Sequence, residues 1–377
     1  TFGNTPPLHV DGKHLKDANG NIVRLHGVMD TPSAWFNNGR WGWNYDDAGR
    51  QRCIDYFKKL FDGMANPELG TYCNVFRLHL EPAWTNDNSV NYSYKDENGQ
   101  TVTAGKTGDG EANIEHFSKS RLTTYLKTLY TRIAKEAIGR GLYVIMRPPG
   151  VCPGTIQVGD AYHHYLLDVW DIVSKNDTVL KYSGQISIEL ANEPITVRDA
   201  NGQSSPNALH DFFQPIVDKI RANGFTGIIW GVGTGYQSGY EGYATYPLES
   251  YNIGYAVHVY TGWYGQEDKN ANAQTFINNF KRQVPVVETN PIVVTEIDWS
   301  PQNTNEIDHV NEMGQNVYKN FGTWATGSTS KWGVAWKAVH DYYGNIGMTL
   351  TGTSDFYDID KWIVNNDLSY ASWKNKA

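Results

Sequence analysis

The sequence predicts a single (β/α)8 TIM barrel spanning residues 1–377, with an N-terminal β-hairpin and a long insertion after the second strand. Short apolar runs without polar alternation recur along the chain, as expected of parallel strands that are covered on both faces. These runs alternate with longer segments of helical spacing. The 377 residues suit one barrel of about 250 residues with insertions, and no segment has the composition of a linker.

The first predicted element is a hairpin, because Asp11-Gly12 and Asn19-Gly20 are turn pairs that hairpins favour. It leads into the first of eight buried strands. The strands are predicted at residues 23–29, 71–80, 142–146, 184–190, 227–230, 255–259, 292–297 and 333–338.

The segments between these strands have the apolar spacing of amphipathic helices, and Gly141 and Gly224 follow two of them where a C-cap is expected. Residues 81–116 are rich in Asn, Gly, Asp and Thr, and we interpret them as a surface insertion with a small hairpin around Asn98-Gly99. Helices are predicted at residues 46–64, 118–140, 162–174, 207–222, 273–282, 310–324 and 358–364.

Composition excludes several classes of function. The net charge of −8 leaves no basic surface for nucleic acid. No apolar run approaches the ~20 residues of a membrane span, and the three cysteines form no CxxC pair that would indicate zinc. We expect a monomer without cofactor or metal. The 13 Trp and 24 Tyr with only 19% charged residues suit stacking against a flat, uncharged ligand, or a large aromatic core.

Two predicted strands end in a carboxylate. The run that begins at Ser187 ends in Asn192-Glu193-Pro194, and the run that begins at Pro291 reaches Glu296. The two glutamates are 103 residues apart, which is three βα units at roughly 35 residues each. They should therefore face each other across the C-terminal rim of the barrel, where two carboxylates can hydrolyse a glycosidic bond.

Polar residues at other strand ends suggest how the two carboxylates differ. Arg77 and Tyr260 are predicted to keep Glu296 ionised as the nucleophile. Glu193 is predicted to be the acid/base, since Pro194 and apolar neighbours would shield it. Asn192 is assigned to the sugar 2-OH, His258 to orienting a carboxylate, and Trp336 to stacking on a sugar ring. Alone, a glutamate at a strand end would be interpreted as a structural ion pair, His258 as a core histidine and Trp336 as a core tryptophan. The inference therefore rests on the joint pattern.

These motifs resemble glycoside hydrolase family 5, a family of retaining (β/α)8 hydrolases that includes cellulases. The resemblance spans nearly the whole chain and implies Glu193 as acid/base and Glu296 as nucleophile. The matching segments, in order, are Val10-Asp11-Gly12, Asp17 to Gly20, Phe76-Arg77-Leu78, Asn192-Glu193-Pro194, His258-Val259-Tyr260, Thr295-Glu296-Ile297 and Trp336.

One position departs from the family pattern. A histidine usually closes the third strand, and here the strand ends in Arg147-Pro148-Pro149. Either Arg147 takes over part of that role at the substrate, or His163 or His164 reaches in from the next helix.

The expected activity is that of a secreted, periplasmic or cell-surface endo-β-1,4-glucanase, a mature form whose signal peptide has been removed. An endo-β-1,4-mannanase, a xyloglucanase or a mixed-linkage glucanase is the alternative substrate assignment. A non-catalytic carbohydrate-binding barrel and a metal-dependent barrel hydrolase are the alternatives from other classes. Aromatic residues on loops motivate the open groove of an endo-acting enzyme. For those on residues 31–44, packing beneath the loop is an equal alternative. The tryptophans assigned to substrate are Trp35, Trp41, Trp43, Trp84, Trp263 and Trp299.

Overall fold

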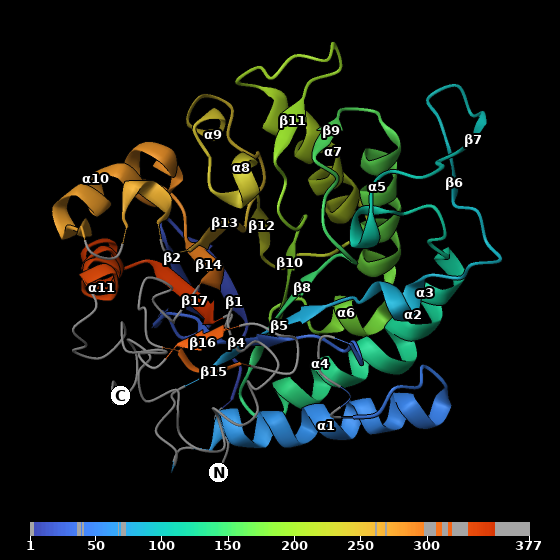
Figure 1. Cartoon of the computed structure of the whole chain (residues 1–377), viewed down its shortest axis with the longest axis horizontal. Coiled ribbons are helices and arrows are strands. Elements are labelled where there is room, and N and C mark those ends of the chain that lie inside the picture. The colour runs from blue at the N-terminus through green and yellow to red at the C-terminus, as the bar shows by residue number, and fades with distance from the viewer. Residues whose placement is uncertain are drawn as a thin grey trace.

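The computed structural model describes residues 4–35, 39, 41–66, 68, 73–260, 262–267, 270–297, 307–310, 316–318 and 331–350. Eight parallel strands close into a barrel in chain order, with the last strand pairing with the first (Figure 1). The predicted barrel is therefore confirmed. Its strands are β4 (His26–Asp30), β5 (Val75–His79), β8 (Tyr143–Arg147), β10 (Ile186–Glu189), β12 (Ile229–Gly231), β13 (Ile253–Val259), β14 (Ile292–Ile297) and β17 (Ile346–Leu350).

The predicted N-terminal hairpin is also present. Strand β1 (Leu8–Asp11) pairs antiparallel with β2 (His14–Asp17), which pairs with β3 (Ile22–Val23). The Leu8 N–H donates to the carbonyl of Gly184, just ahead of β10, and the Val10 N–H donates to Asn252, just ahead of β13. The hairpin therefore packs against the N-terminal ends of the strands, away from the rim that carries Glu193 and Glu296.

Helices surround the barrel. Asp46 caps α1 (Asp47–Ala65), and its side chain accepts from the Gly49 N–H. One predicted helix is a continuous run of α3 (Lys119–Tyr125), the π-helical turn η3 (Leu126–Tyr130) and α4 (Thr131–Ile138). The other helices are α5 (Ala161–Lys175), α6 (Asp177–Lys181), α7 (Ala208–Ala222), α10 (Ala273–Gln283) and α11 (Lys331–Tyr343), with short turns at α9 (Gly242–Thr245) and η6 (Pro285–Glu288). No helix in these ranges is long and apolar enough to cross a membrane.

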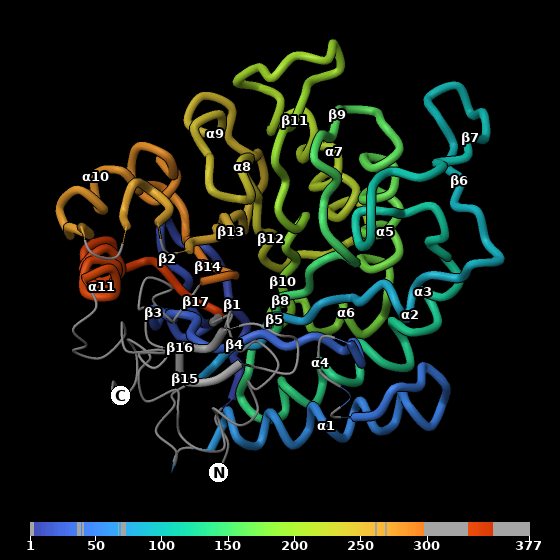
Figure 2. The backbone as a smooth tube through the Cα atoms, viewed as in Figure 1, coloured from blue at the N-terminus to red at the C-terminus, as the bar shows by residue number. Residues whose placement is uncertain are grey.

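The insertion after β5 begins with α2 (Pro82–Thr85) and forms the predicted hairpin, β6 (Ser93–Lys95) with β7 (Thr101–Thr103), which projects from the right of Figure 1. It continues into η2 (Gly110–Ala112). Two further rim loops are joined by a parallel pair, β9 (Thr155–Gln157) with β11 (Thr196–Arg198), side by side at the top of Figure 2.

The prediction for the eighth strand is wrong. Residues 333–338 belong to helix α11, and the eighth strand is β17. The apolar run at 333–338 is one face of the helix, whose buried positions recur at three- and four-residue intervals (Trp332, Ala335, Trp336, Val339, His340 and Tyr343). Gly344, with φ of +74°, ends the helix and was the missed signal.

The predicted helix at residues 310–324 is also wrong where it can be compared. Strand β15 (Ile307–Val310) pairs antiparallel with β16 (Asn316–Tyr318). The predicted helix at residues 358–364 lies outside the described residues.

Candidate active site

Six of the predicted site residues lie together at the C-terminal rim. Arg77 is in β5, His258 in β13 and Glu296 in β14, whereas Glu193 follows β10. Asn192 lies three residues after the end of β10, and Tyr260 directly follows β13. Because all eight strands are parallel, their C-terminal ends meet at this rim.

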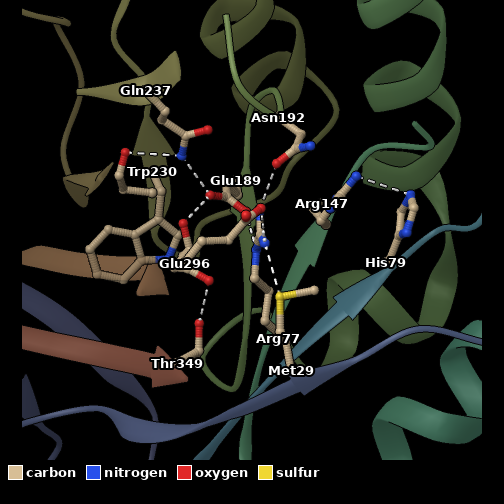
Figure 3. Close-up of polar contacts among 12 residues, drawn as sticks. Met29, Arg77, His79, Arg147, Glu189, Asn192, Trp230, Gln237, Glu296 and Thr349 are labelled. Carbon is tan, nitrogen blue, oxygen red and sulfur yellow. Dashed lines mark hydrogen bonds and ion pairs between the residues drawn. The ribbon is translucent and has the colours of Figure 1, made fainter. Parts of the chain in front are cut away.

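Arg77 is the fully buried centre of the site. Its Nε donates to Glu189 Oε1 at 2.7 Å, and its Nη1 donates to Glu296 Oε2 at 3.0 Å (Figure 3). Its Nη2 donates to Asn192 Oδ1 at 3.0 Å. One guanidinium therefore fixes a carboxylate from β10, the carboxylate of β14 and the amide that precedes Glu193.

Glu296 is held as a carboxylate. The hydroxyl of Tyr260 donates to its Oε1 at 2.6 Å, opposite the oxygen that accepts from Arg77. Burial alone would raise the pKa of Glu296, but the charges of His258, Arg77 and Arg147 and the tyrosine hydroxyl outweigh burial and lower it to about 2. Glu296 is therefore ionised throughout the neutral and mildly acidic range.

Glu193 has a different environment. Its backbone is left-handed, with φ of +55°, a conformation that is uncommon for residues other than glycine. Its Oε2 lies 3.1 Å from Nδ1 of His258, and its side chain is 23% exposed. Among the described ion pairs, His258 is its partner, whereas Glu296 contacts an arginine as well.

His258 brings the two carboxylates together. One carboxylate oxygen of Glu193, one of Glu296 and a ring nitrogen of His258 all lie within 4.8 Å of one another. The Nε2 of His258 is 3.6 Å from Glu296 Oε2. Two carboxylates this close, one ionised and one partly exposed, can act on the two sides of a single bond.

A second acidic cluster lies next to this site. His79 ends β5, Glu81 follows it and Glu111 comes from η2 in the insertion. One donor atom from each lies within 4.8 Å of the others, a spacing that would suit a metal ion. However, His79 Nε2 accepts from the Gly150 N–H at 2.9 Å, so the proton of the neutral ring is on Nδ1, which faces Glu81. A protonated nitrogen is not a metal ligand.

The cluster is better suited to hold a proton than a cation. Burial and the neighbouring charge of Glu111 raise the pKa of Glu81 to about 8, although the charge of Arg147 opposes them. Glu81 Oε2 lies 3.1 Å from the protonated Nδ1 of His79, and Glu111 Oε1 is buried without a hydrogen-bond partner among the described residues. A protonated Glu81 avoids a second negative charge beside Glu111 in this buried cluster.

Arg147 ends β8 at the same rim and is 5% exposed. Its Nη2 contacts His79 Nε2 at 3.1 Å (Figure 3). The same nitrogen donates to the carbonyl of Gly150. Neither alternative histidine reaches in: His163 bonds to Phe212 of α7, and His164 stacks on Tyr94. Of the three candidates for the position where a histidine is usual, Arg147 is therefore the one at the site.

A family model named Cellulase (glycosyl hydrolase family 5) matches residues 70–337, more than half of the chain. The chain belongs to glycosyl hydrolase family 5. This membership supports hydrolysis of O-glycosyl bonds as its class of reaction. No curated protein sequence matches the chain.

Solved structures agree with the fold. A β-glucanase from Saccharophagus degradans, in complex with cellotetraose, has a TM-score of 0.58 at 14% identity, covering 97% of this chain and 94% of that one. The catalytic domain of a Thermobifida fusca endoglucanase has a TM-score of 0.53 at 18% identity, covering 93% and 86%. A β-mannanase from Streptomyces thermolilacinus with mannohexaose has 0.50 at 13% identity, covering 93% and 86%. At these identities the likeness establishes the fold.

Three tryptophans that we assigned to substrate are wrong for that role. Trp336 lies on helix α11 and is fully buried, with its indole packed on Phe276 and Phe280 of α10. Trp84 is also fully buried and donates to the carbonyl of Pro32, and Trp41, only 3% exposed, stacks on Trp84. The indole faces of all three pack inside the protein, so the core interpretation of the aromatic loop holds for Trp41.

The other assigned tryptophans differ in exposure. Trp35 and Trp43 are 52% and 60% exposed on the loop after β4. Trp263 is half-buried in η4 (Trp263–Gly265), with its ring edge-on to Tyr260 at 5.1 Å between centroids. Trp299 lies outside the described residues.

Two residues of the site were not predicted. Glu189, in β10, is fully buried and accepts from Arg77, Gln237 and Thr295. A charged residue inside an apolar strand was a signal for it. Gln237, on a loop rich in Gly and Tyr, had no distinguishing signal in the sequence.

Proposed function

We propose that this family 5 member is a retaining endo-β-glycanase, with β-1,4-glucan of the cellulose type as its preferred substrate. The observation that carries the proposal is the approach of Glu193 and Glu296, whose nearest carboxylate oxygens are within 4.8 Å. Retaining glycosidases have their two carboxyl groups about 5–5.5 Å apart, whereas inverting enzymes leave about 6.5–9.5 Å for a water molecule.

In the first step, Glu296 attacks the anomeric carbon while Glu193 gives its proton to the departing glycosidic oxygen. The C–O bond to the leaving sugar breaks and a glycosyl ester forms on Glu296. In the second step, Glu193 takes a proton from water, which attacks the same carbon and releases Glu296 as a carboxylate. The low pKa of Glu296, about 2, suits a nucleophile that must be ionised.

The neighbours have supporting roles in this proposal. Arg77 and Tyr260 occupy both oxygens of Glu296 and orient it. His258 lies between the carboxylates and contacts Glu193 at 3.1 Å. Asn192, anchored by Arg77, is available to the sugar 2-OH, a bond that strengthens in the transition state.

The proposal of an open groove rests on aromatic residues near the rim. A cavity of about 370 Å³ is lined by Trp263, Tyr236 and their neighbours, and Trp263 adjoins Tyr260. Exposed indoles at Trp35 and Trp43 offer further flat surfaces for sugar rings. Because a β-1,4-glucan polysaccharide is too large to enter the cell intact, we also propose a secreted, periplasmic or cell-surface location.

The test is product profiling on purified β-1,4-glucan, β-mannan, mixed-linkage glucan and xyloglucan. We expect a series of oligosaccharides from β-1,4-glucan with an early fall in viscosity. Glu296→Gln should abolish turnover and keep polysaccharide binding. Release of no reducing sugar by the wild type from any substrate would refute hydrolysis and favour the binding barrel. Full activity in Glu296→Gln would refute the nucleophile assignment.

A further inference from the structure

The loop after β12 has a strained backbone that is bonded to the segment after Glu193. Gly235, Tyr236 and Gln237, in α8 (Thr234–Gln237), are three consecutive residues with φ between +60° and +65°. Left-handed backbone at residues other than glycine costs about 1–3 kcal/mol and persists where surrounding structure holds it. Here the Gly235 N–H donates to the carbonyl of Ile195, and the Gln237 N–H to that of Pro194.

The strained turn delivers the side chain of Gln237 into the site, where it is fully buried. Its Oε1 accepts from the backbone N–H of Glu193 at 3.0 Å. Its Nε2 donates to Glu189 Oε2 at 2.8 Å and to the carbonyl of Ala256 at 3.1 Å (Figure 3). The amide therefore connects the backbone of Glu193 with the buried Glu189 and with the backbone of β13.

Glu189 continues this connection to the second carboxylate. Its Oε1 accepts from Arg77, which also donates to Glu296. Its Oε2 accepts from Gln237 and from the hydroxyl of Thr295 at 2.5 Å, and Thr295 precedes Glu296 in β14. A continuous chain of buried hydrogen bonds thus runs from the backbone of Glu193 through Gln237, Glu189 and Arg77 to Glu296.

We propose that Gln237 is a positioning residue for general acid catalysis, which holds the backbone of Glu193 in its left-handed conformation and ties its position to that of Glu296 through Glu189. The inference rests on the proposed function, because it gives Glu193 the acid/base role. Gln237 touches neither the substrate nor the reacting atoms in this scheme. It fixes where the proton donor stands.

This role has a signature that a merely structural glutamine lacks. A displaced acid slows substrates whose leaving group needs a proton and spares those whose leaving group departs unaided. A displacement of about 1 Å is enough for a large loss of rate. General destabilisation, in contrast, lowers the amount of active enzyme and affects both substrates by the same factor.

The experiment compares Gln237→Leu with Gln266→Leu. Gln266 is a matched control, because it is 2% exposed on the next rim loop, donates to Gly265 and accepts from Asn272. For Gln237→Leu we expect kcat/KM to fall about tenfold or more further on a glycoside with a poor leaving group than on an activated aryl glycoside. Gln266→Leu should affect both substrates equally.

Gln237→Glu keeps the positioning role testable if the leucine variant is poorly folded. Its carboxyl can mimic the amide only while protonated, since a carboxylate cannot donate to Glu189. Its activity on the poor leaving group should therefore recover relative to the wild type as the pH is lowered. Equal losses on both substrates in Gln237→Leu, or a pH profile of Gln237→Glu parallel to the wild type, would overturn the positioning role.

Failure of the proposed function is distinguishable from failure of this inference. A wild type without activity on any glycoside refutes the function. The crystal structure of Gln237→Leu then tests the positioning by itself: departure of Glu193 from its left-handed φ supports the role, and an unchanged Glu193 overturns it. A wild type with full activity and an unchanged leaving-group dependence in Gln237→Leu refutes the inference alone.

Discussion

The ion pair between Arg77 and Glu189 gives the most specific prediction about stability. Both side chains are 0% exposed, with 2.7 Å between Arg77 Nε and Glu189 Oε1. Arg77→Met leaves Glu189 as a carboxylate in a dry interior, where the hydrogen bonds from Gln237 and Thr295 compensate only part of its charge. Removing one partner of a buried pair costs about 3–5 kcal/mol of the free energy of unfolding.

The double variant Arg77→Met with Glu189→Gln separates that charge effect from the loss of packing. In the double variant the uncompensated carboxylate of Glu189 is gone, whereas Glu296 lacks Arg77 in both Arg77 variants alike, so its loss does not distinguish them. We therefore expect the double variant to lose less than the sum of the single variants, by about 2 kcal/mol or more. Urea unfolding followed by fluorescence of the 13 tryptophans measures all four proteins.

Arg140 provides the control. It pairs with Asp62 and Glu136 at 2.6 and 2.7 Å, as short as the buried pair, but Asp62 is 54% exposed. Arg140→Met should cost only about 0–1 kcal/mol. Single-variant losses from Arg77 and Glu189 that add within about 0.5 kcal/mol in the double variant would contradict the reasoning.

Three further predictions concern the acidic groups. Glu193→Ala should lower kcat about 10²–10⁴-fold for poor leaving groups and far less for activated ones, with rescue by azide; equal losses would argue against the acid role. Tyr260→Phe removes the 2.6 Å hydrogen bond to Glu296. The apparent pKa of the acidic limb of the kcat/KM profile should therefore rise by about one to two pH units. An unchanged acidic limb would contradict the role of this hydrogen bond. Glu81 has a pKa of about 8 in the folded protein and about 4.3 in the unfolded chain. Between these pH values the native state therefore binds more protons than the unfolded state. The stability that protonated Glu81 contributes is present at low pH and is lost as the pH rises to 8. Glu81→Gln should therefore gain stability relative to the wild type from pH 5 to 8, by up to about 1.4 kcal/mol per pH unit, and a constant difference would refute the raised pKa.

The sequence was most informative where hydrophobic pattern and strand ends coincide. Seven of the eight barrel strands could be predicted, because buried parallel strands form short apolar runs that end in polar residues. Arg77, Glu193 and Glu296 could be placed at one rim by the same argument, since parallel strands share their C-terminal edge.

The remaining errors have a common physical origin. A short apolar run does not distinguish a buried strand from the buried face of a helix. Residues 333–338 were therefore predicted as a strand although they belong to α11, and Trp336 was predicted at the site although it lies in the helix layer. Composition does not tell whether a loop tryptophan points outward, and Trp41 packs inward on Trp84. Gln237 depends on a left-handed turn that tertiary contacts impose, and no local pattern encodes such contacts.

The stereochemistry of cleavage is the most direct test of the roles given to Glu193 and Glu296. We would follow the anomeric proton signals of the first products released from a β-1,4-glucan oligosaccharide by NMR, before mutarotation. Two carboxylates with oxygens within 4.8 Å predict that the β-anomer forms first, through a glycosyl ester on Glu296. Initial formation of the α-anomer would mean inversion by a water molecule, and would contradict the roles given to Glu193 and Glu296.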